Sequence, residues 1–284
     1  MERTTGPSRL RRPHWQATIL PLIPRLEVHM QLNFRRQGQG RPVIVIHGLF
    51  GSLDNLNGLS KSLSEHFDVI AVDVRNHGLS PRSEQMNYRD MAEDILHLSE
   101  QLQLERPVLV GHSMGGKIAM MAAGLAPETI GGLVVADMAP VAYTQARHDE
   151  VFKGLQAVIE AGCRDRKAAD EVLSQHVQIA GVRQFLLKSF IPDSADPWRF
   201  NVPVLFGHYR NIMDWPGVEQ PYPGPVLFIK GSESDYLLPE YQPQVVQQFP
   251  KARARVIPGT GHWLHAEKPQ LFNRLVLDFL AEAS

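Results

Sequence analysis

The stretch PVLVGHSMGGKIAMMAAG, residues 107–124, decides the fold of this 284-residue chain. It begins with apolar residues that are typical of a buried strand, turns at Gly-His-Ser-Met-Gly-Gly, and continues as a helix-forming run without proline. Ser113 therefore lies at a tight corner between a strand and a helix, with glycine two positions before it and two after it. Either the turn merely required small residues, or the corner projects the serine hydroxyl beyond the end of a sheet.

The spacing of the glycines favours the second interpretation. A residue at positive φ brings its flanking backbone so close together that side chains two positions away do not fit, and Gly111 and Gly115 stand at those positions. A strand, Gly-x-Ser-x-Gly and a helix form the arrangement known as a nucleophile elbow. The helix after the corner would offer the N–H of Met114 and its positive end to a developing oxyanion. The alternative is a glycine turn with an idle serine.

Apolar runs elsewhere predict the sheet to which this corner belongs. They are short, rich in β-branched residues and rarely alternate with polar ones, as is typical of parallel strands that are buried on both faces. Helical patterns lie between them, as in YRDMAEDILHLSEQLQL, where apolar residues share one face and Asn87 is the predicted N-cap. The alternating run 26–34 predicts an antiparallel edge strand. The predicted buried strands are 43–46, 69–72, 108–110, 133–136, 226–229 and 254–257.

The alternation of strands and helices predicts an α/β fold with a mostly parallel sheet and right-handed crossovers. Residues 141–223 interrupt it, because they contain helical stretches but no convincing buried strand. This segment is too long for a loop, so we expect a helical cap inserted after the sixth strand. The core would then comprise 26–140 and 224–284, and residues 1–25 would form an N-terminal extension that we expect to be disordered.

A serine hydroxyl is a weak nucleophile at neutral pH and needs a base to accept its proton. In α/β enzymes with this corner, the histidine follows the serine and the acid in chain order. His262 lies in a glycine-rich loop between the last predicted strand and the last predicted helix, from which it could reach the end of the sheet. His262 is therefore the predicted base. His265, nearer to the last helix, is its rival.

Two aspartates compete to orient this histidine. Asp137 ends the strand LVVAD, and Asp235 follows the next core strand. Both would lie at the carboxyl edge of the sheet, so the residues alone leave the choice open. The aspartate that does not pair with the histidine is expected to accept hydrogen bonds from loop N–H groups.

A second oxyanion donor is expected from the loop after the first parallel strand, VIVIHGLFGSLDN. Its His-Gly pair turns the chain sharply and would leave the N–H of Leu49, or alternatively that of Phe50, facing the serine. In the neighbouring loop VDVRNHGLSPR, Asp73 and Arg75 are predicted to form a structural ion pair.

Composition argues against several other classes of protein. A net charge of −1, 43% hydrophobic residues and 21% charged residues are typical of a globular protein and give no nucleic-acid footprint. The single cysteine excludes an internal disulfide and a multi-cysteine metal site. The chain has no HExxH sequence, acidic cluster or glycine-rich nucleotide motif, so neither a metal nor a nucleotide cofactor is expected. No apolar run approaches the ~20 residues of a membrane-spanning helix.

Several longer strings resemble one known family. HGLFGSLDNL, DVRNHGLSPR, GHSMGGKIAM, DMAP, QFLLKSF, WRFNVPVL and GHWLHAEKP are together similar to the YbfF-type bacterial esterases of the α/β-hydrolase superfamily, from about Leu32 to the C-terminus. The resemblance implies a cytoplasmic, cofactor-free carboxylesterase with a helical cap, acting on short to medium acyl esters or on acyl thioesters. It matches Ser234 to a serine sometimes counted with the site. It favours Asp137 as the acid, since these proteins tend to lack a carboxylate at the place of Asp235, whose presence here is a departure.

The predicted reaction is ester cleavage through an acyl-enzyme on Ser113. The expected substrate is a small-molecule ester or thioester, and the protein is expected to be a monomer or a homodimer. A cofactor-free perhydrolase of the haloperoxidase type would use the same residues. A ligand-binding receptor that kept the shape without turnover is the alternative from another class. Dehalogenases and epoxide hydrolases of this fold need aspartate at position 113, so the serine counts against both. The predicted pocket residues are Phe50, His112, Ser234, Phe185 and Trp263.

Overall fold

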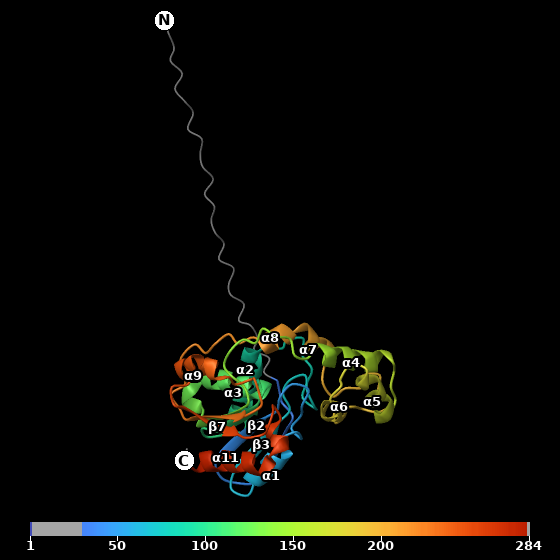
Figure 1. Cartoon of the computed structure of the whole chain (residues 1–284). Helices are drawn as coiled ribbons and strands as arrows, with labels where there is room; N and C mark the ends of the chain where they lie inside the picture. Colours follow the sequence, from blue (N-terminus) through green and yellow to red (C-terminus); the bar gives the residue numbers. More distant parts are fainter. Residues whose placement is uncertain (2–29, 283–284) are drawn as a thin grey trace.

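A twisted sheet of seven strands forms the centre of the computed structural model, which describes Met1 and residues 30–282 (Figure 1). The strand order is β1-β3-β2-β4-β5-β6-β7; β1 is antiparallel to β3, and all other neighbours are parallel. The strands are β1 (Phe34–Gln37), β2 (Pro42–Ile46), β3 (Asp68–Val72), β4 (Val108–His112), β5 (Gly132–Ala136), β6 (Val226–Gly231) and β7 (Ala252–Ile257).

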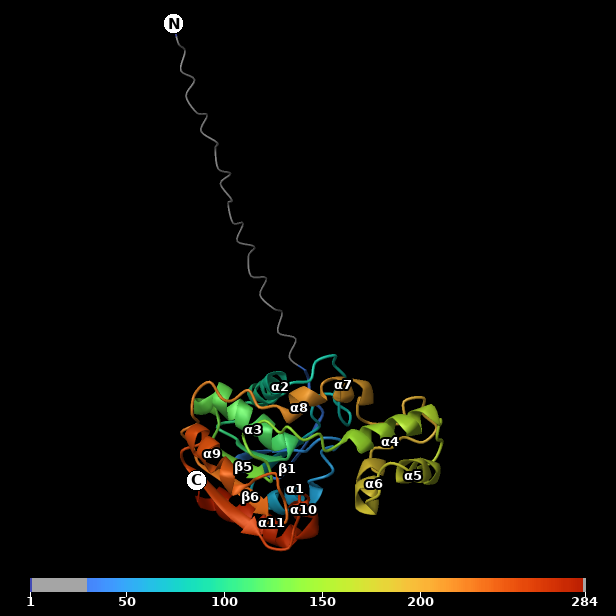
Figure 2. The same cartoon turned by 45° about the horizontal axis from the view of Figure 1, so that its top comes forward.

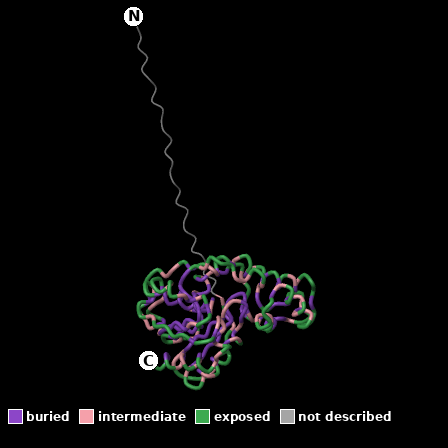
Figure 3. Tube along the Cα trace, in the orientation of Figure 1, coloured by how far each residue is buried: buried purple, intermediate pink, exposed green. Residues whose placement is uncertain are grey.

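Helices cover both faces of this sheet. They are α1 (Asn57–Leu63), α2 (Tyr88–Gln101), α3 (Met114–Leu125), α9 (Gln242–Gln248), α10 (Leu264–Glu267) and α11 (Pro269–Glu282). Successive side chains of a strand point to opposite faces. Accordingly, Val43 and Val45 of β2 belong to the apolar cluster with α1 and α11, whereas Ile44 and Ile46 pack with α2 and α3. The buried trace therefore concentrates at the sheet (Figure 3).

The sequence-based interpretation is confirmed for the parallel strands and for the helix that Asn87 caps, since the Asn87 side chain accepts the N–H of Asp90. The antiparallel edge is also confirmed, but β1 begins at Phe34, where the predicted strand 26–34 ends. Residues 26–29 and the predicted extension, apart from Met1, lie outside the described residues. The prediction that 254–257 is buried on both faces was wrong. The strand β7 pairs with β6 alone and is exposed along most of its length, because it is the edge of the sheet.

Between β5 and β6 the chain leaves the sheet and forms five helices, which we call the insertion (residues 141–223). They are α4 (Asp149–Glu160), α5 (Arg166–Ser174), α6 (Ala180–Leu187), α7 (Val202–Gly207) and α8 (Tyr209–Met213). The first three of them lie to one side of the core, whereas α8 lies beside α2 and α3 (Figure 2). The prediction that the insertion follows a sixth strand was wrong. In the described chain it follows the fifth strand, β5, because only one strand, β1, precedes β2 among the described residues.

A buried lysine fastens the end of the insertion to the core. Lys117, on α3, is fully buried and donates hydrogen bonds from its Nζ to the carbonyl oxygens of Met213 (3.0 Å) and Asp214 (2.9 Å). Its ammonium group also lies over the rings of Tyr88 and Tyr143. Burial lowers the pKa of Lys117 to about 7.

No helix in the described part of the chain is long and apolar enough to cross a membrane.

Candidate active site

The corner between β4 and α3 is strained in the way that the glycine spacing predicts. Ser113 has φ 54° and ψ −121°, in the left-handed half of backbone space. A Cβ atom on Gly111 would lie 2.1 Å from the carbonyl oxygen of Gly115, and one on Gly115 would lie 2.3 Å from that of Ile46. Neither position therefore accepts a side chain, and the tight approach of strand and helix pushes the Ser113 hydroxyl beyond the sheet.

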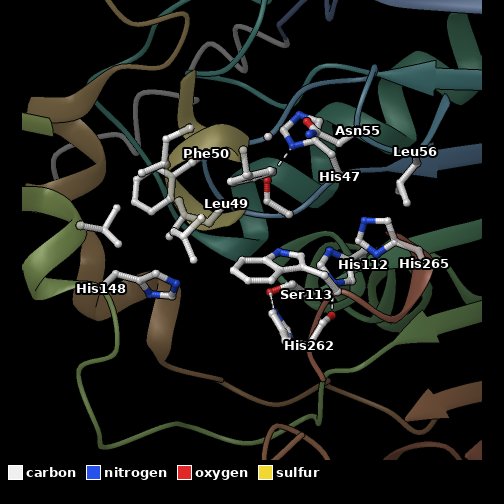
Figure 4. A pocket seen from close by; sticks show the side chains of 17 residues that line it. His47, Leu49, Phe50, Asn55, Leu56, His112, Ser113, His148, His262 and His265 are labelled. Atoms are coloured by element: carbon white, nitrogen blue, oxygen red, sulfur yellow. Dashed lines mark hydrogen bonds between the residues drawn. The ribbon is translucent and has the colours of Figure 1, made fainter. Parts of the chain in front are cut away.

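Three side chains from distant parts of the sequence form one hydrogen-bonded line at this corner. His262 Nε2 is 2.9 Å from Ser113 Oγ, and His262 Nδ1 is 2.7 Å from Asp137 Oδ2 (Figure 4 shows the serine and the histidine). A carboxylate only accepts hydrogen bonds, so Nδ1 carries the proton and donates it to Asp137. The lone pair of Nε2 is then directed at the serine hydroxyl, in the position needed to accept its proton.

The carboxylate of Asp137 is completely buried and has further partners. Its Oδ1 accepts the N–H of Gly231 at 3.0 Å, and its Oδ2 also accepts the hydroxyl of Ser234. Two loops, one after β5 and one after β6, thus meet at this acid. The sequence analysis predicted Ser234 as a pocket residue, but Ser234 does not line the pocket in front of Ser113. It lies behind His262, because its hydroxyl is held by the buried carboxylate.

Asp235, the rival acid, pairs with an arginine and forms no hydrogen bond with His262. Its side chain is 59% exposed and forms an ion pair with Arg147 of the insertion. The hydrogen bond from Arg147 lowers the pKa of the Asp235 carboxyl. The structure therefore brings Asp137, and not Asp235, to His262, and it gives the additional aspartate a different partner.

In the loop after β2, the N–H groups of Leu49 and Phe50 differ in whether they are engaged. The N–H of Phe50 donates to His77 Nε2 at 3.2 Å, and Phe50 itself has φ 62°. Within the described residues, no acceptor takes the N–H of Leu49 or that of Met114. Both residues line a small pocket together with Ser113.

Two histidines that the sequence analysis did not assign hold this loop in place. His47 donates from Nδ1 to the carbonyl of Gly48 (2.8 Å) and accepts the N–H of Val74 at Nε2 (3.0 Å). His77 donates from Nδ1 to the carbonyl of Arg75 (3.0 Å) while it accepts the N–H of Phe50. Burial lowers the pKa of His77 to about 3, so it stays neutral and keeps its acceptor nitrogen. The sequence signal that could have found them is a His-Gly pair in each of the loops after β2 and β3, at His47 and at His77.

The predicted ion pair between Asp73 and Arg75 does not form. Asp73 accepts the N–H groups of Leu53 (2.8 Å) and Leu79 (2.9 Å). Arg75 forms its ion pairs with Asp90 and Asp94 of α2. The two charges thus meet different elements: Asp73 accepts from the loops after β2 and β3, and Arg75 pairs with α2.

The pocket in front of Ser113 is mostly apolar, and the insertion supplies one side of it (Figure 4). Phe185, from α6, lies 6.1 Å from Trp263 between ring centroids. Both of these predicted residues line the pocket, as does Phe50. His112 also lines it and donates from Nε2 to the carbonyl of His262 (2.8 Å). Further lining side chains are Leu49, Asn55, Leu56, His148, Val151, Val182, Leu186 and His265.

His265 does not replace His262. Its ring packs against that of His112 at 4.3 Å between centroids, and burial lowers its pKa to about 4. No group of three or more His, Cys, Asp or Glu side chains among the described residues is arranged to hold a metal ion.

Comparison with known proteins agrees with this geometry. Residues 43–275 match the model of the alpha/beta hydrolase family. The chain belongs to this family. It is 44% identical over 256 residues to esterase YbfF of Escherichia coli (strain K12), covering 88% of this chain and 99% of that protein. It is 40% identical to the sn-1-specific diacylglycerol lipase ABHD11 of Mus musculus, covering 84% and 80%.

A solved structure extends the likeness to three dimensions. A marine microorganism esterase superposes with a TM-score of 0.84 at 36% identity, covering 88% of this chain and 99% of that one. The chain is thus a YbfF-type esterase of the α/β-hydrolase superfamily and a carboxylesterase-type hydrolase.

Proposed function

We propose that this protein cleaves carboxylic esters through an acyl-enzyme on Ser113, with His262 as general base and Asp137 as the acid that orients it. The observation that carries the proposal is the continuous line from Ser113 Oγ through both nitrogens of His262 to Asp137 Oδ2. An idle serine in a glycine turn would need neither partner.

The reaction begins when His262 Nε2 accepts the proton of Ser113 and the serine oxygen attacks the ester carbonyl. The carbonyl oxygen becomes negative and would be held by the N–H groups of Leu49 and Met114, the latter at the positive end of α3. Asp137 stabilises the imidazolium that forms. His262 then donates its proton to the departing alcohol, and the acyl group remains on Ser113. A water molecule, deprotonated by His262, releases the acid by the same steps in reverse order.

We propose short to medium acyl chains as the preferred substrates, and the lining of the pocket supports a hydrocarbon group beside the serine. Leu49, Phe50, Val151, Phe185 and Trp263 offer an apolar surface beside the serine, which suits a hydrocarbon chain. Thioesters of similar acyl groups are the second class that we propose. We also propose the division predicted from the sequence, with 26–140 and 224–284 as the catalytic core and 141–223 as a cap that completes the acyl pocket.

The test is the steady-state hydrolysis of p-nitrophenyl butyrate by the wild type and by Ser113→Ala at pH 7 to 8. We expect turnover by the wild type and a loss of at least about 10³-fold in the variant, as in other serine hydrolases. Equal rates in both proteins would refute a nucleophilic Ser113. Covalent labelling of Ser113 without steady-state turnover would instead favour the receptor, and halide oxidation with peroxide and a carboxylic acid, faster than ester hydrolysis, would favour the perhydrolase.

A further inference from the structure

Two hydrogen bonds do not by themselves fix the plane of the His262 ring. Both contacts lie at the edge of the ring, at Nδ1 and Nε2, and neither of them touches a face of the imidazole. A turn of the imidazole about its Cβ–Cγ bond would move Nε2 out of line with the Ser113 hydroxyl, and hydrogen bonds weaken steeply with misalignment. A residue packed against the face of the imidazole would oppose this turn and keep Nε2 in line with the serine hydroxyl.

Tyr236 lies against that face. Its ring is 3.9 Å from the ring of His262 between centroids, with 23° between the planes, which is a stacked arrangement. The guanidinium carbon of Arg147 lies 4.4 Å from the centroid of the same tyrosine ring. Because His262 covers one face of Tyr236 at stacking distance, the guanidinium contacts the other face. Tyr236 is thus enclosed between the histidine and an arginine of the insertion.

The backbone around Tyr236 keeps the ring in this place. Its carbonyl accepts the hydroxyl of Tyr143 at 2.5 Å, and its N–H donates to Ser234 Oγ at 3.3 Å. Ser234 in turn holds Asp137, so the same short segment touches both the acid and the ring that the acid orients. Burial raises the pKa of Tyr236 to about 12, so that the stacked ring stays neutral near pH 7.

We infer that Tyr236 is a positioning residue of this active site: its ring fixes the plane of His262, and Arg147 clamps it from the insertion. The inference rests on the proposed function, since it gives the orientation of a base for Ser113. The π face of Tyr236 also favours the positive charge that His262 carries in the transition state, because aromatic faces attract cations. Arg147 adds no net charge opposite it, since Asp235 pairs with the guanidinium.

Three variants separate positioning from a general structural role. Tyr236→Leu removes the flat ring, and Tyr236→Phe keeps the ring but removes its hydroxyl. Tyr241→Leu is the matched control, since Tyr241 is also half-buried and packs edge-on against Tyr143, 6.3 Å between centroids. Each is measured for kcat and KM on p-nitrophenyl butyrate and for thermal unfolding, and crystal structures of the two Tyr236 variants are determined.

We expect Tyr236→Leu to lower kcat on the order of ten-fold, the size of one cation–π contact together with a misaligned hydrogen bond, while KM changes less than about two-fold. Tyr236→Phe and Tyr241→Leu should retain wild-type kcat. In crystals of Tyr236→Leu the imidazole should be tilted, with Nε2 no longer within hydrogen-bond distance of Ser113 Oγ. An unmoved imidazole in that variant would overturn the inference, and so would equal kcat losses in Tyr236→Leu and Tyr241→Leu. If the wild type hydrolyses no ester, the proposed function fails, and the crystal structures still decide whether Tyr236 positions the ring.

Discussion

Replacing Asp137 with asparagine is the substitution that tests the site most sharply, because the carboxylate has only donors around it. It accepts the N–H of Gly231, the hydroxyl of Ser234 and the Nδ1–H of His262. An amide has one oxygen and one NH₂ group. If the amide oxygen stays on Gly231, the NH₂ group faces His262 and can only donate to it. The proton of the imidazole must then move to Nε2, and the Ser113 hydroxyl loses its acceptor.

This wrong tautomer should reduce kcat on the order of 10⁴-fold, the loss measured for the equivalent change in another serine hydrolase. Asp235→Asn is the matched control, since it makes the same chemical change at the residue that directly follows Ser234. Its carboxylate is 59% exposed and pairs with Arg147. Ion pairs at the surface contribute little, so we expect a loss of less than about three-fold.

The assay is p-nitrophenyl butyrate hydrolysis at saturating substrate, with far-UV circular dichroism and thermal unfolding to show that both variants are folded. Small, similar losses in the two variants would rule out Asp137 as the orienting acid. It would also be ruled out if Asp235→Asn lost more activity than Asp137→Asn, because the exposed aspartate would then be the orienting acid.

Two further predictions concern stability. Gly111→Ala should lower the free energy of unfolding by about 3 kcal/mol or more, since the new Cβ would lie 2.1 Å from a backbone oxygen. Gly58→Ala in α1 should be neutral or stabilising, because beyond its chain neighbours and the backbone of its own helix no atom lies within 4 Å of the new Cβ. Urea denaturation measures both, and a Gly111→Ala variant as stable as the wild type would contradict the strained corner. Burial lowers the pKa of Lys117 to about 7 from its usual 10.5, so the unfolded chain binds the extra proton between these pH values and the stability of the wild type should rise with pH there. Relative to Lys117→Met, the gain from pH 7 to pH 9 should be about 2 to 3 kcal/mol in urea unfolding, and parallel pH profiles would exclude a depressed pKa.

Local signals carried most of what the sequence could predict. The corner at Ser113 is specified by its own glycines, and Asn87 caps its helix with its own side chain, so neither depends on distant residues. The choice between Asp137 and Asp235 could not be made in this way. Both follow a buried strand, and what separates them is Arg147, a residue of the insertion whose position relative to the sheet no local pattern encodes. The exposure of β7 was missed for the same reason, since it depends on strand order.

The strand order also explains why the acid can stand after β5. β5 is the direct neighbour of β4, and the N–H of Ser113 donates to the carbonyl of Ala136, the residue before Asp137 (3.0 Å). The acid is therefore one strand away from the nucleophile. Asp235 lies one strand further out, on the loop after β6, and that loop contributes Ser234 to the carboxylate instead.

Asp137 itself has φ 52°, an uncommon conformation for a residue other than glycine, which turns its side chain across the end of the sheet toward the loop of His262. Its burial would be costly for a lone charge. Three donors compensate for it, and they come from the last residue of β6, the loop after β6 and the loop after β7. The same contacts that make the carboxylate tolerable in the interior also fasten those two loops together, so the stability of this corner and the orientation of the base depend on one group.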